Sequence, residues 1–305
     1  MSILRSEIES IIAASGATVM GVAIKHLETG EELYLNADQT FPLCSVFKIP
    51  VLAEAFHQIE AGKLTLEDRW ELTLAEKNLP SGILVFLQDG LMPTLCDLLT
   101  LMIIISDNTA TDMVMHRLGV PNITKFMHGL GLTDIHVPMT VRDLFNDIMG
   151  EAGSDPRLAF TNLDKPQKEE TANRTGRAYS LEPDNDVGTP RALNRLLELI
   201  FQGAVVSRTA CDQMLQIMLQ QQLNLRLPRF LPEGTPVAHK TGTLGGIRND
   251  SGIIYCNEHA HVAVTVFCTW DTAAVKDDPV AEWDRINALD SAFGHIGRLV
   301  YEHFK

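Results

Sequence analysis

Strand-forming segments stand at the two ends of this sequence and enclose a long helical middle. Short runs rich in β-branched and aromatic residues, bounded by turn residues, are typical of antiparallel strands. Residues 64–203 instead carry apolar residues mainly at helical spacing. The predicted strands are 17–25, 31–35, 237–241, 252–256 and 261–269, and clear helical segments are 45–61, 95–105, 109–118 and 191–201. Strands so far apart share one sheet only if the helical middle is an insertion.

This order predicts an α/β fold of the α+β kind, with an antiparallel five-stranded sheet flanked by terminal helices and an inserted all-α lobe. The terminal helices are expected at 1–16 and 280–304. The expected α/β lobe comprises 1–42 and 205–305, and the all-α lobe comprises 43–204 with a long loop around 151–186. We expect the active site in the cleft between the lobes.

Charge and hydropathy exclude several classes of partner. The chain of 305 residues has a formal net charge of −14, which repels nucleic-acid phosphates and anionic lipid surfaces. No apolar run is long enough to cross a bilayer. We therefore expect no nucleic-acid or membrane partner. A small-molecule substrate and a monomer are expected as well.

The N-terminal segment is typical of an amphipathic helix rather than a signal peptide. Arg5, Glu7 and Glu9 interrupt its apolar residues, and no small-residue cleavage site follows them. We expect a cytoplasmic protein, or a periplasmic or secreted one if a signal peptide has been removed.

The cysteines and histidines show no spacing of a disulfide framework or a metal site. An odd, scattered set of cysteines without a Cys-x-x-Cys pair indicates free thiols in a reducing compartment. We expect no metal and no organic cofactor. The cysteines are Cys44, Cys96, Cys211, Cys256 and Cys268.

The first motif that indicates chemistry is Ser45-Val46-Phe47-Lys48, at the start of a predicted helix. Residues three apart share a helix face, so these two polar side chains can reach each other. A serine hydroxyl needs a base to become a nucleophile, and lysine is a base only when burial or nearby cations lower its pKa. We expect Ser45 to be the nucleophile and Lys48 its base. Alone, the pattern also fits a capping serine beside an exposed lysine.

The second motif is Ser106-Asp107-Asn108, directly after the apolar run 98–105. A buried helix ending in this triplet would project Ser106 and Asn108 into a cleft. The serine could then relay a proton to a leaving nitrogen, and the asparagine could bind a substrate amide. Asp107 is suited to the N-cap of the next helix, which is the alternative role for the triplet.

The third motif is Lys240-Thr241-Gly242, on a predicted strand. Lys240 would supply a cation for a substrate carboxylate and keep Lys48 neutral. Thr241 adds a hydroxyl donor, and Gly242 would let a substrate lie close to the strand. The developing oxyanion would accept hydrogen bonds from backbone N–H groups at the start of the helix that carries Ser45, and the N–H of Thr243 would be the second donor. An ordinary edge strand leading into a glycine-rich turn is the alternative.

These three motifs in this order are the signature of class A β-lactamases and penicillin-binding proteins. The sequence resembles class A serine β-lactamases over nearly its whole length, including Asp186 with Thr189-Pro190, which is similar to the end of the family's Ω loop. The resemblance implies that Ser45 forms an acyl-enzyme, with Lys48 and Ser106 as proton carriers. The residues it assigns to substrate binding are Asn108, Lys240, Thr241, Gly242, Thr243 and Arg248.

One family motif, the Glu-x-x-Leu-Asn of the Ω loop, is missing from the sequence. Its glutamate activates the water that hydrolyses the acyl-enzyme. The nearest string is Glu169-Glu170-Thr171-Ala172-Asn173, which implies an insertion between 143 and 182. Glu169 is preferred over Glu170 and Glu182 because Asn173 stands four residues on, as the family's asparagine does. A solvated loop carboxylate is the alternative for each of them.

Three functions therefore stay open. The first is a β-lactam hydrolase that works through a serine acyl-enzyme. The second is an esterase or amidase of the same fold acting on other substrates, and the third is a penicillin-binding or sensor protein that traps the acyl group. A water-activating carboxylate near Ser45 separates the first two from the third.

Overall fold

The computed structural model describes residues 1–153, 155–157 and 173–305. Its main sheet has five antiparallel strands in the order β2-β1-β7-β6-β5, which confirms the predicted sheet. β1 pairs with β7, so strands from opposite ends of the sequence are neighbours. The strands are β1 (Val19–His26), β2 (Glu32–Leu35), β5 (Val237–Leu244), β6 (Ile247–Asn257) and β7 (Ala260–Thr269).

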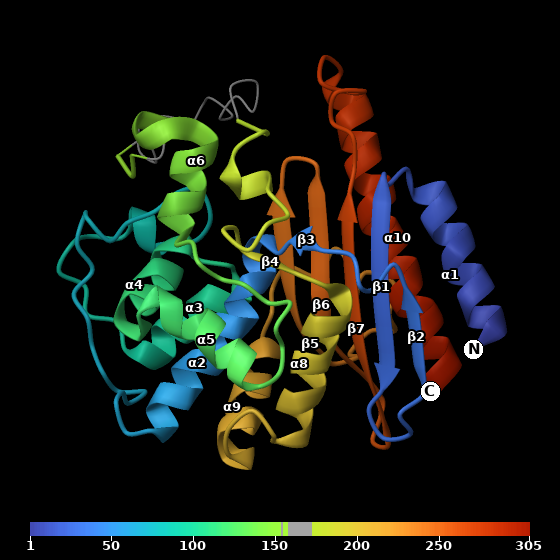
Figure 1. Ribbon diagram of the computed structural model, residues 1–305, viewed down its shortest axis with the longest axis horizontal. Helices are drawn as coiled ribbons and strands as arrows, with labels where there is room; N and C mark the ends of the chain where they lie inside the picture. Colours follow the sequence, from blue (N-terminus) through green and yellow to red (C-terminus); the bar gives the residue numbers. More distant parts are fainter. Residues whose placement is uncertain (154, 158–172) are drawn as a thin grey trace.

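The two terminal helices cover one face of this sheet. α1 (Ser2–Ser15) and α10 (Pro279–Phe304) pack against each other and lie on the same side of the strands (Figure 1). Along β7, Val264 and Val266 point to these helices, whereas Ala263 and Phe267 belong to the core on the other face. Both faces of the sheet are thus buried, because successive side chains of a strand alternate between them.

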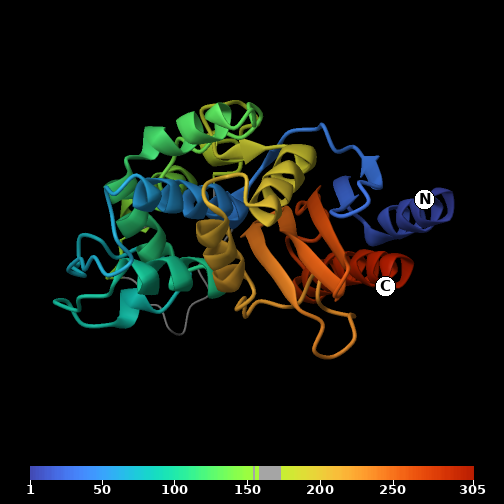
Figure 2. The same ribbon diagram turned by 90° about the horizontal axis from the view of Figure 1, so that it is seen from below.

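The helical part of the chain packs on the second face. Figure 2 shows α2 running through this part, and it contacts α3, α4, α5 and α9. A short two-stranded sheet joins β3 (Phe41–Pro42) to β4 (Val187–Gly188). The helices are η1 (Cys44–Phe47), α2 (Lys48–Glu60), η2 (Leu84–Phe86), α3 (Leu95–Ile104), α4 (Asn108–Leu118), α5 (Val120–Gly129), α6 (Val141–Gly153), η4 (Arg177–Tyr179), α8 (Pro190–Gln202) and α9 (Arg208–Met218).

Side-chain caps explain where two of these helices begin. Asp107 is the N-cap of α4, and its carboxylate accepts a hydrogen bond from the N–H of Ala110 at 2.9 Å. Thr189 caps α8 in the same way, with Pro190 at the first helical position. Both roles satisfy backbone N–H groups that lack partners within the helix, and both confirm the sequence prediction.

Residues 64–94 differ from the prediction of mainly helical structure, because among them only η2 is helical. Pro80, Gly82 and Gly90 interrupt this stretch, and such residues disfavour helix interiors. The Asp107 carboxylate accepts the N–H groups of Ile83 at 2.7 Å and Leu84 at 2.9 Å. The loop is therefore tied to the start of α4.

The lobe boundaries at 42/43 and 204/205 stay a prediction. α8 contacts both the sheet strands β1 and β7 and the helix α9. The loop expected around 151–186 begins later, since α6 extends to Gly153. Across the described ranges, none of the helices combines the length and the apolar character needed to span a bilayer.

Candidate active site

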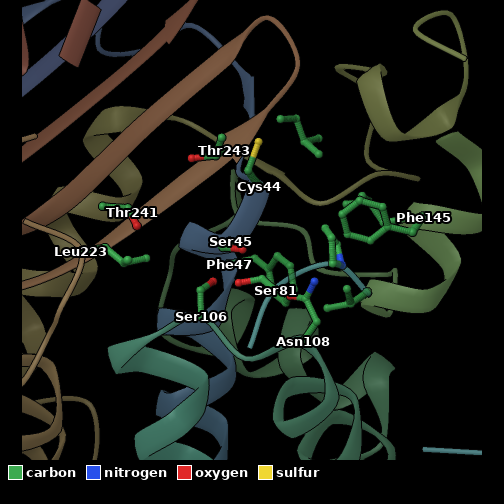
Figure 3. A pocket seen from close by; sticks show the side chains of 14 residues that line it. Cys44, Ser45, Phe47, Ser81, Ser106, Asn108, Phe145, Leu223, Thr241 and Thr243 are labelled. Atoms are coloured by element: carbon green, nitrogen blue, oxygen red, sulfur yellow. The ribbon is translucent and has the colours of Figure 1, made fainter. Parts of the chain in front are cut away.

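Ser45 lies at the junction between β3 and the start of α2, in η1. The residue before it, Cys44, has a φ of 49°, a left-handed conformation that is uncommon for residues other than glycine and often occurs at functional sites. The approach to this turn is fixed by Asn249, whose side chain donates to the carbonyl oxygens of Pro42 at 2.8 Å and Leu43 at 3.1 Å. The serine is half-buried, and its side chain lies beside a cavity (Figure 3).

Lys48 is fully buried one turn further on, at the start of α2. Its Nζ donates to Ser106 O at 2.8 Å and Ser106 Oγ at 3.0 Å. A third bond, of 2.9 Å, goes to Asn108 Oδ1. Burial lowers the pKa of the Lys48 amine to about 7, although the nearby carboxylates of Asp107 and Asp112 act in the opposite direction. An amine with this pKa is available as a base near neutral pH.

The Ser106-Asp107-Asn108 triplet forms the junction between α3 and α4. Ser106 has a φ of 59°, so the backbone turns sharply here between the two helices. Asn108 holds its own orientation by donating from Nδ2 to Leu79 O at 3.0 Å. The two polar side chains that the sequence predicted for a cleft both line the cavity.

Lys240 is fully buried on β5, and its Nζ donates to the carbonyl oxygen of Thr241 at 2.7 Å. Burial lowers the pKa of the Lys240 amine well below its ordinary value, and the nearby Lys48 cation lowers it further. Two lysines thus lie close together behind the cavity, and a positive charge on Lys48 disfavours one on Lys240.

The structure gives a reason for glycine at position 242 that the sequence does not indicate. A Cβ at this position would lie 2.7 Å from Leu43 O and 3.1 Å from the Cβ of Cys44. The chain's own backbone beside Ser45 therefore makes the close approach to β5 that only glycine permits. The expected contact with a substrate at Gly242 stays a prediction.

Arg226 belongs to the site, although no sequence pattern indicates it. Its guanidinium donates to Thr243 Oγ1 at 2.6 Å, to Gly242 O at 2.8 Å and to Asn249 O at 2.6 Å. It also pairs with the buried Asp290 at 3.0 Å. Arg226 lies in an irregular segment before β5, where local periodicity gives no signal. Its role depends on contacts between segments far apart in the sequence.

Arg248 lies opposite Thr243 in the pairing of β5 with β6. Its Nη1 donates to two backbone carbonyls, Leu244 O at 3.1 Å and Ile247 O at 3.0 Å. It does not line the cavity. Its expected support of a substrate carboxylate stays a prediction.

The cavity has a volume of about 250 Å³ and combines a polar side with an apolar side. Figure 3 shows Ser45, Ser106, Thr241 and Asn108 around it, with Phe145 projecting from another direction. The structure therefore brings residues of all three motifs together at one cavity. The lining residues are Cys44, Ser45, Phe47, Pro80, Ser81, Ser106, Asn108, Val141, Leu144, Phe145, Leu223, Thr241, Thr243 and Leu244.

The predictions of a water-activating carboxylate have different outcomes for the different residues. Glu169 and Glu170 lie outside the described residues. Glu182 is exposed and does not line the cavity. Asp186, expected at the end of the Ω loop, is buried, and its Oδ1 accepts the N–H of Met139 at 3.0 Å. Its backbone oxygen accepts the N–H of Leu43 at 2.8 Å, which ties this loop to the turn before Ser45.

All five cysteines are free, as predicted. Cys44 is the one that adjoins the nucleophile Ser45. Burial raises the pKa of the Cys44 thiol to about 12, so this group is protonated at neutral pH. In the ranges that the structure covers, no three residues among the histidines, cysteines and acids gather as a set of metal ligands.

Known proteins with similar sequence and structure agree on one family. The sequence model of the beta-lactamase enzyme family matches residues 3–304. Beta-lactamase CARB-4 of Pseudomonas aeruginosa is 25% identical over 296 residues, which cover 96% of this chain and 87% of that protein. The extended-spectrum beta-lactamase PER-1 of the same species is 26% identical over 312 residues, which cover 98% and 87%. The crystal structure of a beta-lactamase from Sphaerobacter thermophilus DSM 20745 superposes with a TM-score of 0.76 at 26% identity, covering 98% of this chain and 96% of that one. The resemblance to class A serine β-lactamases is thus confirmed, and the chain belongs to the beta-lactamase enzyme family.

Proposed function

We propose that this protein hydrolyses β-lactams through an acyl-enzyme formed on Ser45. The observation that carries the proposal is the buried Lys48 amine, which donates to Ser106 Oγ at 3.0 Å directly beside the cavity that Ser45 lines. A nucleophile, a base and a proton relay are the minimum that amide cleavage needs, and Ser45, Lys48 and Ser106 are the candidates for these three roles.

In the proposed acylation step, Ser45 Oγ attacks the lactam carbonyl carbon and Lys48 takes its proton. The ring C–N bond breaks, and the leaving nitrogen receives a proton through Ser106 Oγ. The N–H groups of Ser45 and Thr243 would hold the developing oxyanion. The burial that keeps the pKa of Lys48 at about 7 supports its role as the base.

The remaining polar groups of the cavity would orient the substrate. Asn108 Oδ1 accepts from Lys48, and its Nδ2 donates to Leu79 O, so the amide is fixed in one orientation. Thr241 and Thr243 line the cavity from β5. We assign the substrate amide to Asn108 and the substrate carboxylate to the side of Lys240, Thr241 and Thr243.

The assigned partner is a small-molecule substrate, because the site is a cavity of about 250 Å³. A monomer is expected, and the oligomeric state and the compartment stay predictions. No ion or organic cofactor enters the proposed chemistry, since every step uses side chains of this chain.

Intact-protein mass spectrometry with benzylpenicillin tests the proposal. An adduct of the mass of the intact drug on the parent, absent from Ser45→Ala, is the expected result. Loss of β-lactam absorbance at a rate above that of Ser45→Ala would establish hydrolysis. If the parent forms no adduct and hydrolyses no β-lactam, the proposal is wrong and esters or other amides become the substrates to examine.

A further inference from the structure

The side of the cavity formed by α6 is apolar. Val141, Leu144 and Phe145 stand at positions i, i+3 and i+4 of this helix, so they share one face, and all three line the cavity. Val141 and Leu144 are almost completely buried, with exposed fractions of 3% and 5%. Figure 3 shows the Phe145 ring projecting from α6 into the cavity. We call these three residues the α6 wall.

The first turn of α6 is fixed relative to the lysine of the site. Asp112 Oδ1 accepts the N–H of Val141 at 2.7 Å, and its Oδ2 accepts the N–H of Arg142 at 2.9 Å. Asp112 lies in α4 one turn after Asn108, whose Oδ1 accepts from Lys48 at 2.9 Å. Two hydrogen-bonded steps through one helix therefore determine where Val141 stands relative to Lys48.

Within the described part of the chain, the residues that line the cavity include no aspartate and no glutamate. Asp112, the buried carboxylate that binds the first turn of α6, accepts three N–H donors: Val141 N, Arg142 N and Asn78 Nδ2 at 2.8 Å. A water molecule beside an acyl group on Ser45 would thus meet hydrocarbon at the α6 wall. Hydrocarbon cannot take a proton from water, and it disfavours a water molecule that lacks polar partners.

We propose that hydrolysis of the acyl-enzyme is the slow step of this protein's reaction, because the α6 wall presents hydrocarbon to the acyl group and the described residues that line the cavity offer no carboxylate to activate a water molecule. The inference rests on the proposed acylation of Ser45. In hydrolysis, the water oxygen bonds to the acyl carbon and the bond from that carbon to Ser45 Oγ breaks. One water proton must pass to a base, and Ser45 Oγ must regain a proton. The amine of Lys48 would then have to act as the base.

Rapid mixing of the parent with benzylpenicillin, followed by acid quenching and intact-mass measurement, tests this directly. We expect a burst of about one equivalent of adduct, formed at least about tenfold faster than it decays. Val141→Glu should speed decay of the adduct by about 100-fold or more, which is the usual contribution of a general base. Val141→Gln is the matched control. Its side chain has the shape of glutamate but cannot act as a base, so it should not speed decay of the adduct.

The outcomes separate the two proposals. Absence of any adduct on the parent overturns the acylation of Ser45 itself. Adduct formation that is slower than its decay, so that no burst appears, leaves acylation intact and overturns the slow hydrolysis. The inference would also be overturned if the parent accumulates no adduct and a Glu169→Gln variant accumulates it. That result would assign activation of the water to Glu169. If Val141→Glu fails to fold, as thermal unfolding would reveal, the burst of the parent still decides.

Discussion

Lys48 Nζ donates to Ser106 Oγ at 3.0 Å although the two residues are 58 positions apart in the sequence. The contact joins the first turn of α2 to the junction of α3 and α4. Because Lys48 is completely buried, the bond lies in a region of low dielectric, where hydrogen bonds to an amine strongly affect proton transfer. The proposed acylation depends on this pair.

Replacing Ser45 by alanine should abolish acylation and leave the fold intact. The side chain is half-buried beside the cavity, so its removal creates little empty volume. Loss of a covalent nucleophile typically slows an enzyme by roughly 10⁴-fold or more. Rapid-quench acylation rates, with circular dichroism to check folding, measure the effect. Near-normal turnover by a folded Ser45→Ala protein would remove the central assignment.

Lys48→Ala and Ser106→Ala should each slow acylation by about 100-fold or more, and the double variant should be little slower than the worse single one. The reason is that both groups belong to one hydrogen-bonded proton path. Groups that act as a unit show effects that do not add. Acylation rates of the three variants decide the matter. Additive free energies of activation would mean that one of the residues has only a structural role.

Acylation should also depend on pH with a midpoint near 7. Burial lowers the pKa of Lys48 to about 7, and only the neutral amine can accept the proton of Ser45. As the pH falls below this pKa the amine becomes protonated, so the rate should drop by about tenfold per pH unit and level off above it. A pH series of rapid-quench acylation rates measures this profile. A flat profile between about pH 5 and about pH 9 would exclude Lys48 as the base.

Features set by local patterns could be predicted from the sequence. The strands at both ends follow from β-branched runs between turns, and the N-caps Asp107 and Thr189 follow from side-chain chemistry at helix starts. The three motifs likewise identify Ser45, Ser106, Asn108 and Thr241, and these four residues line one cavity. Residues of one motif stay close together in space because each motif lies on a single element or junction.

Features set by contacts between distant segments could not be predicted. Arg226 reaches Thr243 only after the segment before β5 has packed against α10 and β6. The α6 wall becomes part of the site because Asp112 binds the first turn of α6. Residues 64–94 were expected to be mainly helical, but Asp107 binds backbone N–H groups of this loop. No local period encodes such pairings.

Chelation should leave the activity unchanged. The proposed steps use only Ser45, Lys48 and Ser106, and none of them needs a Lewis acid. Hydrolysis of benzylpenicillin before and after dialysis against EDTA is the measurement, with a zinc-dependent hydrolase treated in parallel as the control. Loss of activity that added zinc restores would contradict a mechanism based on serine.

Replacing Gly242 by alanine should destabilise the fold around Ser45. The added Cβ would lie 2.7 Å from Leu43 O and 3.1 Å from the Cβ of Cys44, and these two residues cannot shift without moving the turn that precedes the nucleophile. Overpacking of this kind typically costs about 1–3 kcal/mol. Gly129→Ala, at the end of α5, is the matched control because a Cβ there meets nothing within 4 Å. Urea unfolding of both variants should show a lower midpoint for Gly242→Ala alone, accompanied by slower acylation. Equal midpoints for the two variants would mean that β5 and the turn at Ser45 can separate at little cost, and that Gly242 is not needed for their close contact.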